Sequence, residues 1–189
     1  MAPTLRTGPS IPARKIYEHY PPTKPPQRVL DFGCGYGHDV RFFNEMGYEA
    51  VGYDPKTYPE LPTGTFDIVA ATYVFGTIDE GWLRARAVKH MESFGHAGTI
   101  FVISHRTWED IGYRRNKEWQ KWKDGWLTER LQFHRGYDFE EAVHELRHDL
   151  SNIQFLYSGG GLLMLTGRLA AWRSSSPDTA EQTALTFDT

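Results

Sequence analysis

Closely spaced glycines follow an apolar run near the start of the chain, and their spacing could bind a ligand. Arg28–Phe32 predicts a buried strand, and Gly33, Gly35 and Gly37 come directly after it. Because glycine has no Cβ, the backbone there can approach a ligand where any other residue would collide with it. The helix predicted from His38 points its free N–H groups and its positive dipole end at that ligand. A negatively charged group is therefore expected there.

Two details separate this ligand from a dinucleotide. The glycines are spaced Gly-x-Gly-x-Gly, whereas the dinucleotide fingerprint is Gly-x-Gly-x-x-Gly. Asp31 lies two residues before Gly33, where a carboxylate opposes a pyrophosphate but suits an ammonium group. Asp54 closes the next predicted strand, Ala50–Tyr53, and can accept hydrogen bonds from both ribose hydroxyls. These features favour S-adenosylmethionine (SAM) as the ligand.

With these motifs, residues 28–104 resemble the class I SAM-dependent methyltransferase family. The resemblance implies that the glycine loop surrounds the methionine part of SAM, that Asp54 binds the ribose, and that residues 71–73 lie beside the sulfonium. The cofactor-binding candidates are Asp31, Phe32, Gly33, Cys34, Gly35, Gly37, Tyr53, Asp54, Thr72 and Tyr73. A non-catalytic SAM-binding regulatory module and a nicotinamide-dependent enzyme of the same topology stay open as alternatives.

The elements that must position these residues alternate along the chain. Strands are expected at 28–32, 50–53, 66–72, 99–104, 152–157 and 162–167, and helices at 13–20, 38–46, 79–94 and 138–150. This pattern predicts an α/β fold: a doubly wound, Rossmann-like, mostly parallel sheet with a C-terminal antiparallel hairpin. Asp79 and Asp138 are the expected helix caps, and Gly95 the expected helix end. Only eleven residues separate Asp54 from Phe66, so the family's third strand is expected to be missing from the sheet edge.

Three residues are candidates for the acceptor side of the site: Tyr73, His105 and Arg106. His105 and Arg106 follow the predicted strand 99–104, at the sheet edge where ligands bind. His105 could act as a general base, or it could be a loop histidine that hydrogen-bonds to backbone. Tyr73 could shape the methyl site or pack in the core. Methyl transfer to an oxygen or a nitrogen of an unassigned acceptor is the expected reaction.

The segment 105–135 combines charge with aromatic rings. It holds eight Lys or Arg and five Asp or Glu, so its balance is +3 in a chain whose net charge is −3. Its rings are Trp108, Tyr113, Trp119, Trp122, Trp126 and Phe133. Such a surface could bind a nucleic acid, or a nucleotide or other small anionic molecule, as the methyl acceptor. The alternative is a lid whose tryptophans pack on the sheet and whose charges are solvated.

A second motif, His144-Glu145-Leu146-Arg147-His148, matches the His-Glu-x-x-His pattern of zinc proteases. Its helix also carries Phe139, Val143 and Leu150 for packing, and no third ligand is evident downstream. The motif is therefore interpreted as part of a packing helix, and no metal is expected.

Composition places the chain among globular proteins. Of its 189 residues, 40% are hydrophobic, and the longest apolar stretches are far too short for a membrane helix. With the lone cysteine and no apolar leader, this predicts a cytoplasmic protein without membrane contact. The expected organisation is an N-terminal arm with a short helix at 1–27, a methyltransferase domain at 28–173 and a disordered tail at 174–189.

Overall fold

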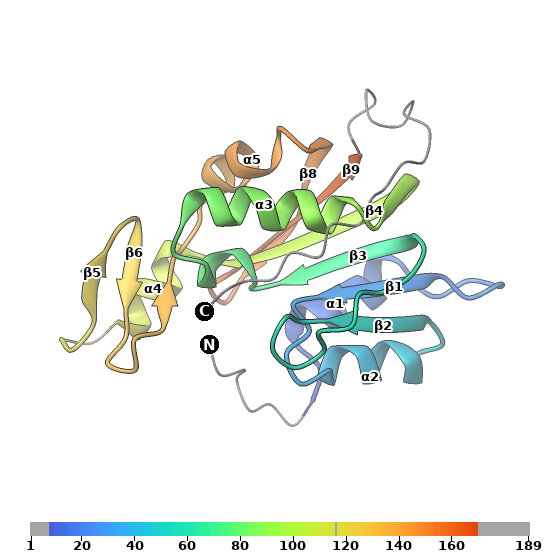
Figure 1. The fold of residues 1–189 in the computed structure, drawn as a ribbon, viewed down its shortest axis with the longest axis horizontal. Helices are drawn as coiled ribbons and strands as arrows, with labels where there is room; N and C mark the ends of the chain where they lie inside the picture. The colour runs from blue at the N-terminus through green and yellow to red at the C-terminus, as the bar shows by residue number, and fades with distance from the viewer. Residues whose placement is uncertain (1–7, 116, 170–189) are drawn as a thin grey trace.

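The computed structural model describes residues 8–115 and 117–169 and has one central sheet. The six strands of that sheet lie in the order β2-β1-β3-β4-β9-β8 (Figure 1). Their bounds are β1 Arg28–Phe32, β2 Glu49–Tyr53, β3 Phe66–Thr72, β4 Gly95–Arg106, β8 Leu150–Gly159 and β9 Leu162–Leu169. β1 to β4 pair in parallel, whereas β9 is antiparallel to both β4 and β8. The predicted fold class and its C-terminal hairpin are confirmed.

The strands at the centre of the sheet are buried on both faces. β1 and β3 have the predicted bounds, and the runs 29–32 and 68–71 within them are buried. Mostly apolar runs that are buried on both faces are typical of parallel strands covered by helices on each side. β2 forms one sheet edge, and the fully described stretch 54–65 contains a turn but no strand that joins the sheet. The expected loss of the family's third strand is therefore confirmed.

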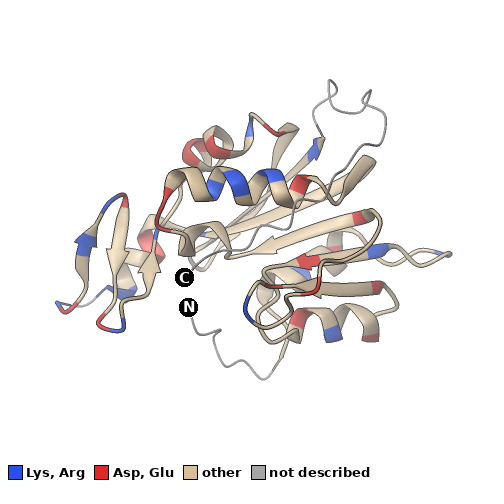
Figure 2. Cartoon of the chain, in the orientation of Figure 1, with Lys and Arg blue, Asp and Glu red and all other residues tan. Residues whose placement is uncertain are grey.

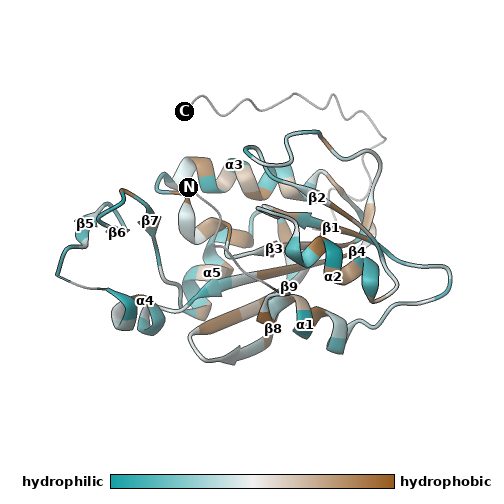
Figure 3. Ribbon diagram, turned by 90° about the horizontal axis from the view of Figure 1, so that it is seen from below, coloured by the Kyte–Doolittle hydropathy of each residue, from teal (hydrophilic) through white to brown (hydrophobic). Residues whose placement is uncertain are grey.

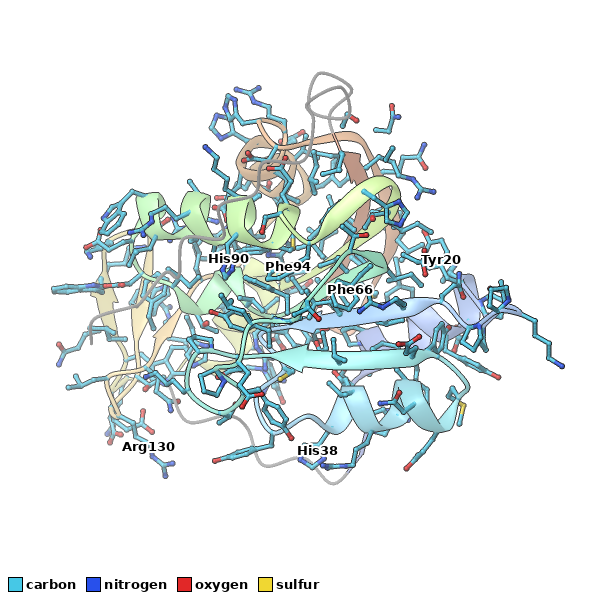
Figure 4. All side chains as sticks on the ribbon, turned by 45° about the vertical axis from the view of Figure 1, so that its right-hand side comes forward. Tyr20, His38, Phe66, His90, Phe94 and Arg130 are labelled. Atoms are coloured by element: carbon cyan, nitrogen blue, oxygen red, sulfur yellow. The ribbon has the colours of Figure 1, made fainter. Side chains whose placement is uncertain are left out.

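Helices cover the two faces of the sheet in pairs. The helices are α1 Ile11–His19, α2 His38–Glu45, α3 Gly81–Glu92, α4 Trp108–Arg114 and α5 Phe139–Leu146, with a 3-10 turn, η1, at Phe75–Thr77. α1 and α2 bury residues such as Ile16 and Phe43 on one face. α3 and α5 bury Met91 and Leu146 on the other, and Figure 1 shows the two layers. In Figure 4, Phe66, His90 and Phe94 lie together between α3 and the sheet.

The helix ends confirm one predicted cap and correct another. Asp138 caps α5 in a capping box with Glu141, as its spacing predicts. The cap predicted at Asp79 is wrong, because Glu80 is the N-cap of α3 and no side chain bonds to the helix start. The Asp79 carboxylate instead accepts a hydrogen bond from the Trp122 indole N–H at 3.1 Å. α3 ends at Glu92, and Gly95 begins β4 instead of ending the helix.

Residues 107–137 lie between β4 and α5 in the sequence and are here called the lid. After α4 it contains a small antiparallel sheet of β5 (Gln120–Trp122), β6 (Gly125–Leu127) and β7 (Phe133–His134). A β-bridge between Thr107 and Tyr137 joins its two ends. The lid projects beyond the carboxyl ends of β3 and β4 (Figure 1). Figure 3 shows that its strands are more hydrophilic than the strands of the central sheet.

At the two ends of the chain, the predicted tail at 174–189 and the first seven residues of the predicted arm lie outside the described residues. α1 packs into the core through Ala13 and Ile16, each 1% exposed, so residues 11–19 are part of the folded unit. Among the described residues, the structure has no helix with the length and apolar character of a membrane span.

Candidate functional site

The glycine loop connects β1 to α2 at the carboxyl edge of the sheet. Gly33, Gly35 and Gly37 all have left-handed backbone conformations, with φ of 79°, 54° and 71°. The N–H groups of Gly33 and Cys34 donate to the Tyr53 carbonyl at 2.7 and 3.1 Å, which ties the loop to the end of β2. Because L side chains rarely adopt these conformations, the sequence uses glycine at all three turning points.

Two of the glycines also leave room that a Cβ would fill. A Cβ on Gly33 would collide with the Val74 side chain, and one on Gly37 would lie 2.9 Å from the Tyr58 hydroxyl oxygen. Gly37 is the N-cap of α2, and no side chain caps that helix. The loop therefore brings bare backbone and the positive end of a helix dipole to the sheet edge.

Asp54 follows β2 and faces the same loop. Its Oδ1 accepts hydrogen bonds from the backbone N–H groups of Lys56 and Thr57 at 2.9 and 3.1 Å. Its Oδ2 accepts from the Gly35 N–H at 3.3 Å, and the Thr57 hydroxyl donates to the Gly35 carbonyl at 2.5 Å. The turn after β2 is thus fastened to the glycine loop. Within the described part of the chain, Asp54 Oδ2 accepts one long hydrogen bond.

The acidic groups give the loop a negative electrostatic character. Burial, and after it the charges of Asp31 and Asp54, raise the pKa of the Cys34 thiol, so Cys34 stays neutral. Asp31 is 2% exposed at the end of β1. The Asp39 carboxylate in the first turn of α2 accepts from the Ser10 N–H and hydroxyl, each at 2.7 Å. A loop that combines backbone donors with these carboxylates fits SAM, whose methionyl group is a zwitterion and whose sulfur is cationic.

Phe32 and Tyr53 reach the loop through their backbones only. Both side chains point into the core below α3, at 5% and 4% exposure, with their ring centroids 5.6 Å apart. Tyr53 also packs against His90 and Phe94. Their side chains therefore stabilise the strand ends that hold the loop.

Tyr73 follows β3 with a left-handed φ of 59°, which is uncommon for a residue other than glycine. Its N–H donates to the Ser104 carbonyl at 3.0 Å, and the Arg106 guanidinium lies 4.9 Å from its ring centroid. Arg106 also donates to the Asp110 carboxylate at 2.9 Å. Thr72 and Tyr73 are half-buried at the end of β3, and Val74, which follows them, lies against Gly33 of the glycine loop. Backbone strain of this kind clusters at functional sites.

His105 lies inside β4, not in a loop after the strand, and is 1% exposed. Its ring centroid is 4.0 Å from that of Tyr137 and 6.1 Å from that of Phe75. Neither ring nitrogen has a hydrogen-bond partner among the described residues, so the predicted backbone bond is also absent there. Burial and then the charge of Arg135 lower the pKa of His105 to about 3. This placement does not support the general-base role.

An ion-pair network of two largely buried arginines joins the lid to α3 and α5. Arg84 of α3 pairs with Asp124 of the lid and, at 3.1 Å, with Glu145 of α5. Arg135 pairs with Asp124 at 2.9 Å, and the Tyr137 hydroxyl donates to Glu145 at 2.9 Å. The glutamate of the His-Glu-x-x-His motif thus has structural partners. No group of three potential metal ligands occurs at 8–115 or 117–169.

Sequence reasoning missed this network because its members are far apart in the chain. Asp124 and Arg84 are 40 residues apart, and no local spacing marks them as partners. The charges of the lid are therefore partly paired instead of solvated. A signal was available at Glu145, since a glutamate on the packing face of a helix requires a buried partner.

Comparisons with solved structures agree with the topology. The PH0226 protein from Pyrococcus horikoshii OT3 superimposes with a TM-score of 0.65 at 12% identity, over 83% of this chain and 87% of that one. The CcbJ methyltransferase from Streptomyces caelestis gives 0.61 at 12% identity, over 87% and 92%. The Burkholderia thailandensis 1,6-didemethyltoxoflavin-N1-methyltransferase, solved with bound 1,6-didemethyltoxoflavin and S-adenosylhomocysteine, gives a TM-score of 0.56 at 17% identity, over 84% of this chain and 76% of that one.

The sequence itself matches a family model. No curated protein is similar enough to match this chain. The model for a methyltransferase domain matches residues 6–154, which include α1, the glycine loop and most of the sheet. The nicotinamide-dependent alternative is therefore not retained. The match and the sheet order agree with the resemblance that the glycine loop indicated, and the chain belongs to the methyltransferase-domain family, as a class I SAM-dependent methyltransferase.

Proposed function

We propose that this protein transfers the methyl group of SAM to an oxygen or nitrogen of an acceptor held between the ends of β3 and β4 and the lid. The observation that supports this most is the glycine loop, with three left-handed glycines fastened to Asp54 at the end of the neighbouring strand. Bound SAM supplies a methyl group already activated by its positive sulfur. The protein then has to bind the two molecules, align them and exclude water.

The roles of the loop residues follow from their chemistry. Backbone N–H groups at the start of α2 hold the methionyl carboxylate, and Asp31 binds the methionyl ammonium group. The Oδ2 of Asp54 accepts a hydrogen bond from the ribose. Thr72 and Tyr73 lie at the end of β3 and border the reacting methyl group. Phe32, Cys34 and Tyr53 act by shaping the backbone of the loop.

The acceptor side involves the residues at the end of β4. The Arg106 guanidinium is held by Asp110 and lies against the Tyr73 ring, so the pair can orient an acceptor with a negative group. A nucleic acid and a small anionic molecule are the two acceptor classes that the lid suggests. The structural neighbours leave this open, because they include a glycopeptide N-methyltransferase and human N-acetylserotonin methyltransferase. A cytoplasmic location stays a prediction from the sequence.

The test is transfer of a labelled methyl group to a cell extract. Purified protein and methyl-labelled SAM are incubated with the extract, and the product is then treated with nuclease or protease and separated by size. We expect the wild type to transfer label to an acceptor in the extract and the Gly33→Ala variant to transfer none. We also expect SAM, and not NAD, to raise the melting temperature. Absence of any labelled product, or stabilisation by NAD alone, would contradict the proposal.

A further inference from the structure

The lid contains a cavity of about 410 Å³ beside the proposed methyl site. α4, the β6–β7 turn and the end of β4 contribute its walls. The lining residues are Arg106, Ile111, Arg114, Trp119, Thr128, Glu129, Arg130, Gln132 and His134. This volume lies within the range of about 300–1,000 Å³ that is usual for small-molecule sites.

Arginines converge on this cavity from three directions. Asp110 holds two of them in place, with its carboxylate 2.9 Å from Arg106 and 2.8 Å from Arg114. Arg130 is exposed at the rim, in the turn after β6 (Figure 4). Glu129 contributes a carboxylate to the wall itself, whereas Asp110 acts through Arg106 and Arg114. Three guanidinium groups against two carboxylates leave the cavity positive, and guanidinium groups bind carboxylate and phosphate in a fork geometry.

Besides the arginines, two aromatic rings line the same cavity. Trp119 and His134 are stacked, with centroids 5.3 Å apart and an angle of 19° between the planes. Burial, followed by the charges of Arg106 and Arg114, lowers the pKa of His134, so its imidazole is held neutral. Both rings line the cavity, and an aromatic ligand can extend their stack next to Ile111.

The cavity and the cofactor loop share a wall. Arg106 lines the cavity and lies 4.9 Å from the Tyr73 ring centroid. Val74, which follows Tyr73 in the chain, packs against Gly33 of the glycine loop. The Tyr73–Arg106 pair therefore borders both the cavity and the proposed methyl site, so an acceptor held in the cavity lies next to that site.

Several other basic residues of the lid have partners outside the cavity. Lys123 pairs with Asp79 at 3.1 Å and also with Glu80, at the start of α3. Arg115 and Lys121 lie over the Trp126 ring. Figure 2 shows acidic segments interspersed with the basic ones over the lid. A phosphate backbone needs a groove of basic groups that tracks it, and these residues do not supply one.

We infer that the lid cavity is the acceptor site and takes a small planar aromatic anion. The ring stacks on Trp119 and His134, and the carboxylate or phosphate binds Arg114 and Arg130. This inference rests on the proposed function, because it places the acceptor of that same reaction. It selects a small molecule over a nucleic acid.

The test measures binding by calorimetry with S-adenosylhomocysteine held at saturation. The ligands are salicylate and its neutral analogue salicylamide, phenyl phosphate, adenosine monophosphate and a short single-stranded oligonucleotide. The variants are Arg130→Ala and Trp119→Ala, with Arg147→Ala as the matched control, because Arg147 is exposed at the end of α5 and outside the cavity. Each variant must first bind S-adenosylhomocysteine as the wild type does, which shows that it is folded.

We expect salicylate or phenyl phosphate to bind at least about tenfold more tightly than salicylamide, a difference of about 1.4 kcal/mol. Arg130→Ala and Trp119→Ala should each weaken that binding several-fold, and Arg147→Ala should leave it unchanged. Equal binding of salicylate and salicylamide would overturn the inference, as would binding of none of the small anions. Tighter binding of the oligonucleotide than of adenosine monophosphate would overturn it in favour of a nucleic acid. If the wild type does not bind S-adenosylhomocysteine, the proposed function itself fails.

Discussion

Replacing Asp54 by asparagine separates the two tasks of this side chain. Oδ1 accepts from the N–H groups of Lys56 and Thr57, and an asparagine carbonyl oxygen can keep both bonds. Among residues 8–115 and 117–169, Oδ2 accepts only from Gly35, at 3.3 Å, and is the oxygen left for a ribose hydroxyl. In Asp54→Asn an NH₂ group takes that place, so the charge is lost and two donors face each other. The fold should persist while cofactor binding weakens.

The loss of one hydrogen bond to a charged group corresponds to about 1.5–3 kcal/mol, or about a 10- to 150-fold weaker affinity for SAM. Calorimetric titration with SAM and S-adenosylhomocysteine measures this, and a urea titration checks that the apo protein is folded. Glu60→Gln is the matched control, because it removes an exposed carboxylate from the same stretch of chain. An Asp54→Asn affinity within about twofold of the wild type would refute the assignment of Oδ2 to the ribose.

Three further perturbations test the loop, the buried histidine and the lid network. In Gly33→Ala the new Cβ collides with the Val74 side chain, and the backbone must keep a φ of 79°. We expect the free energy of unfolding to fall by about 1–3 kcal/mol and SAM binding to be too weak to measure. The double variant Gly33→Ala/Val74→Ala should regain part of the lost stability. Burial lowers the pKa of His105 to about 3, whereas the unfolded chain protonates near its ordinary value. Between these values the unfolded state binds more protons, so the free energy of unfolding should fall as the pH drops from about 6.5 toward 3, by up to about 1.4 kcal/mol per pH unit. His105→Phe should flatten that dependence in urea titrations and retain methyl transfer; loss of transfer in a folded variant would instead identify His105 as part of the reaction. Arg84→Ala should lower the free energy of unfolding by about 3 kcal/mol, which is the lower end of the range for a broken buried ion pair. The lower end applies because Glu145 keeps Arg135 and Tyr137 as partners. An unchanged urea midpoint would show that the network adds no stability.

The parts of the fold that the sequence predicts well are those with a strong local signal. The strands at 28–32 and 66–72 consist mostly of apolar residues, and both faces of each are buried in the structure. The short interval between Asp54 and Phe66 was enough to predict the missing edge strand. The capping box at Asp138 has its partner three residues away, so it too could be found locally.

The features that were missed depend on contacts between distant segments. Asp79 has the spacing of a helix cap, but the lid supplies Trp122 as its partner. His105 follows the most apolar part of its strand, and its burial depends on Tyr137, which is 32 residues later. The strands of the lid are two or three residues long, too short for any alternation of polar and apolar residues to reveal them.

The most direct test of the central claim is a crystal structure of the protein with S-adenosylhomocysteine. We expect the methionyl carboxylate at the glycine loop before α2 and a ribose hydroxyl within hydrogen-bonding distance of Asp54 Oδ2. Electron density for the ligand at another place, or a loop that stays without ligand in a crystal grown at saturating concentration, would contradict the assignment.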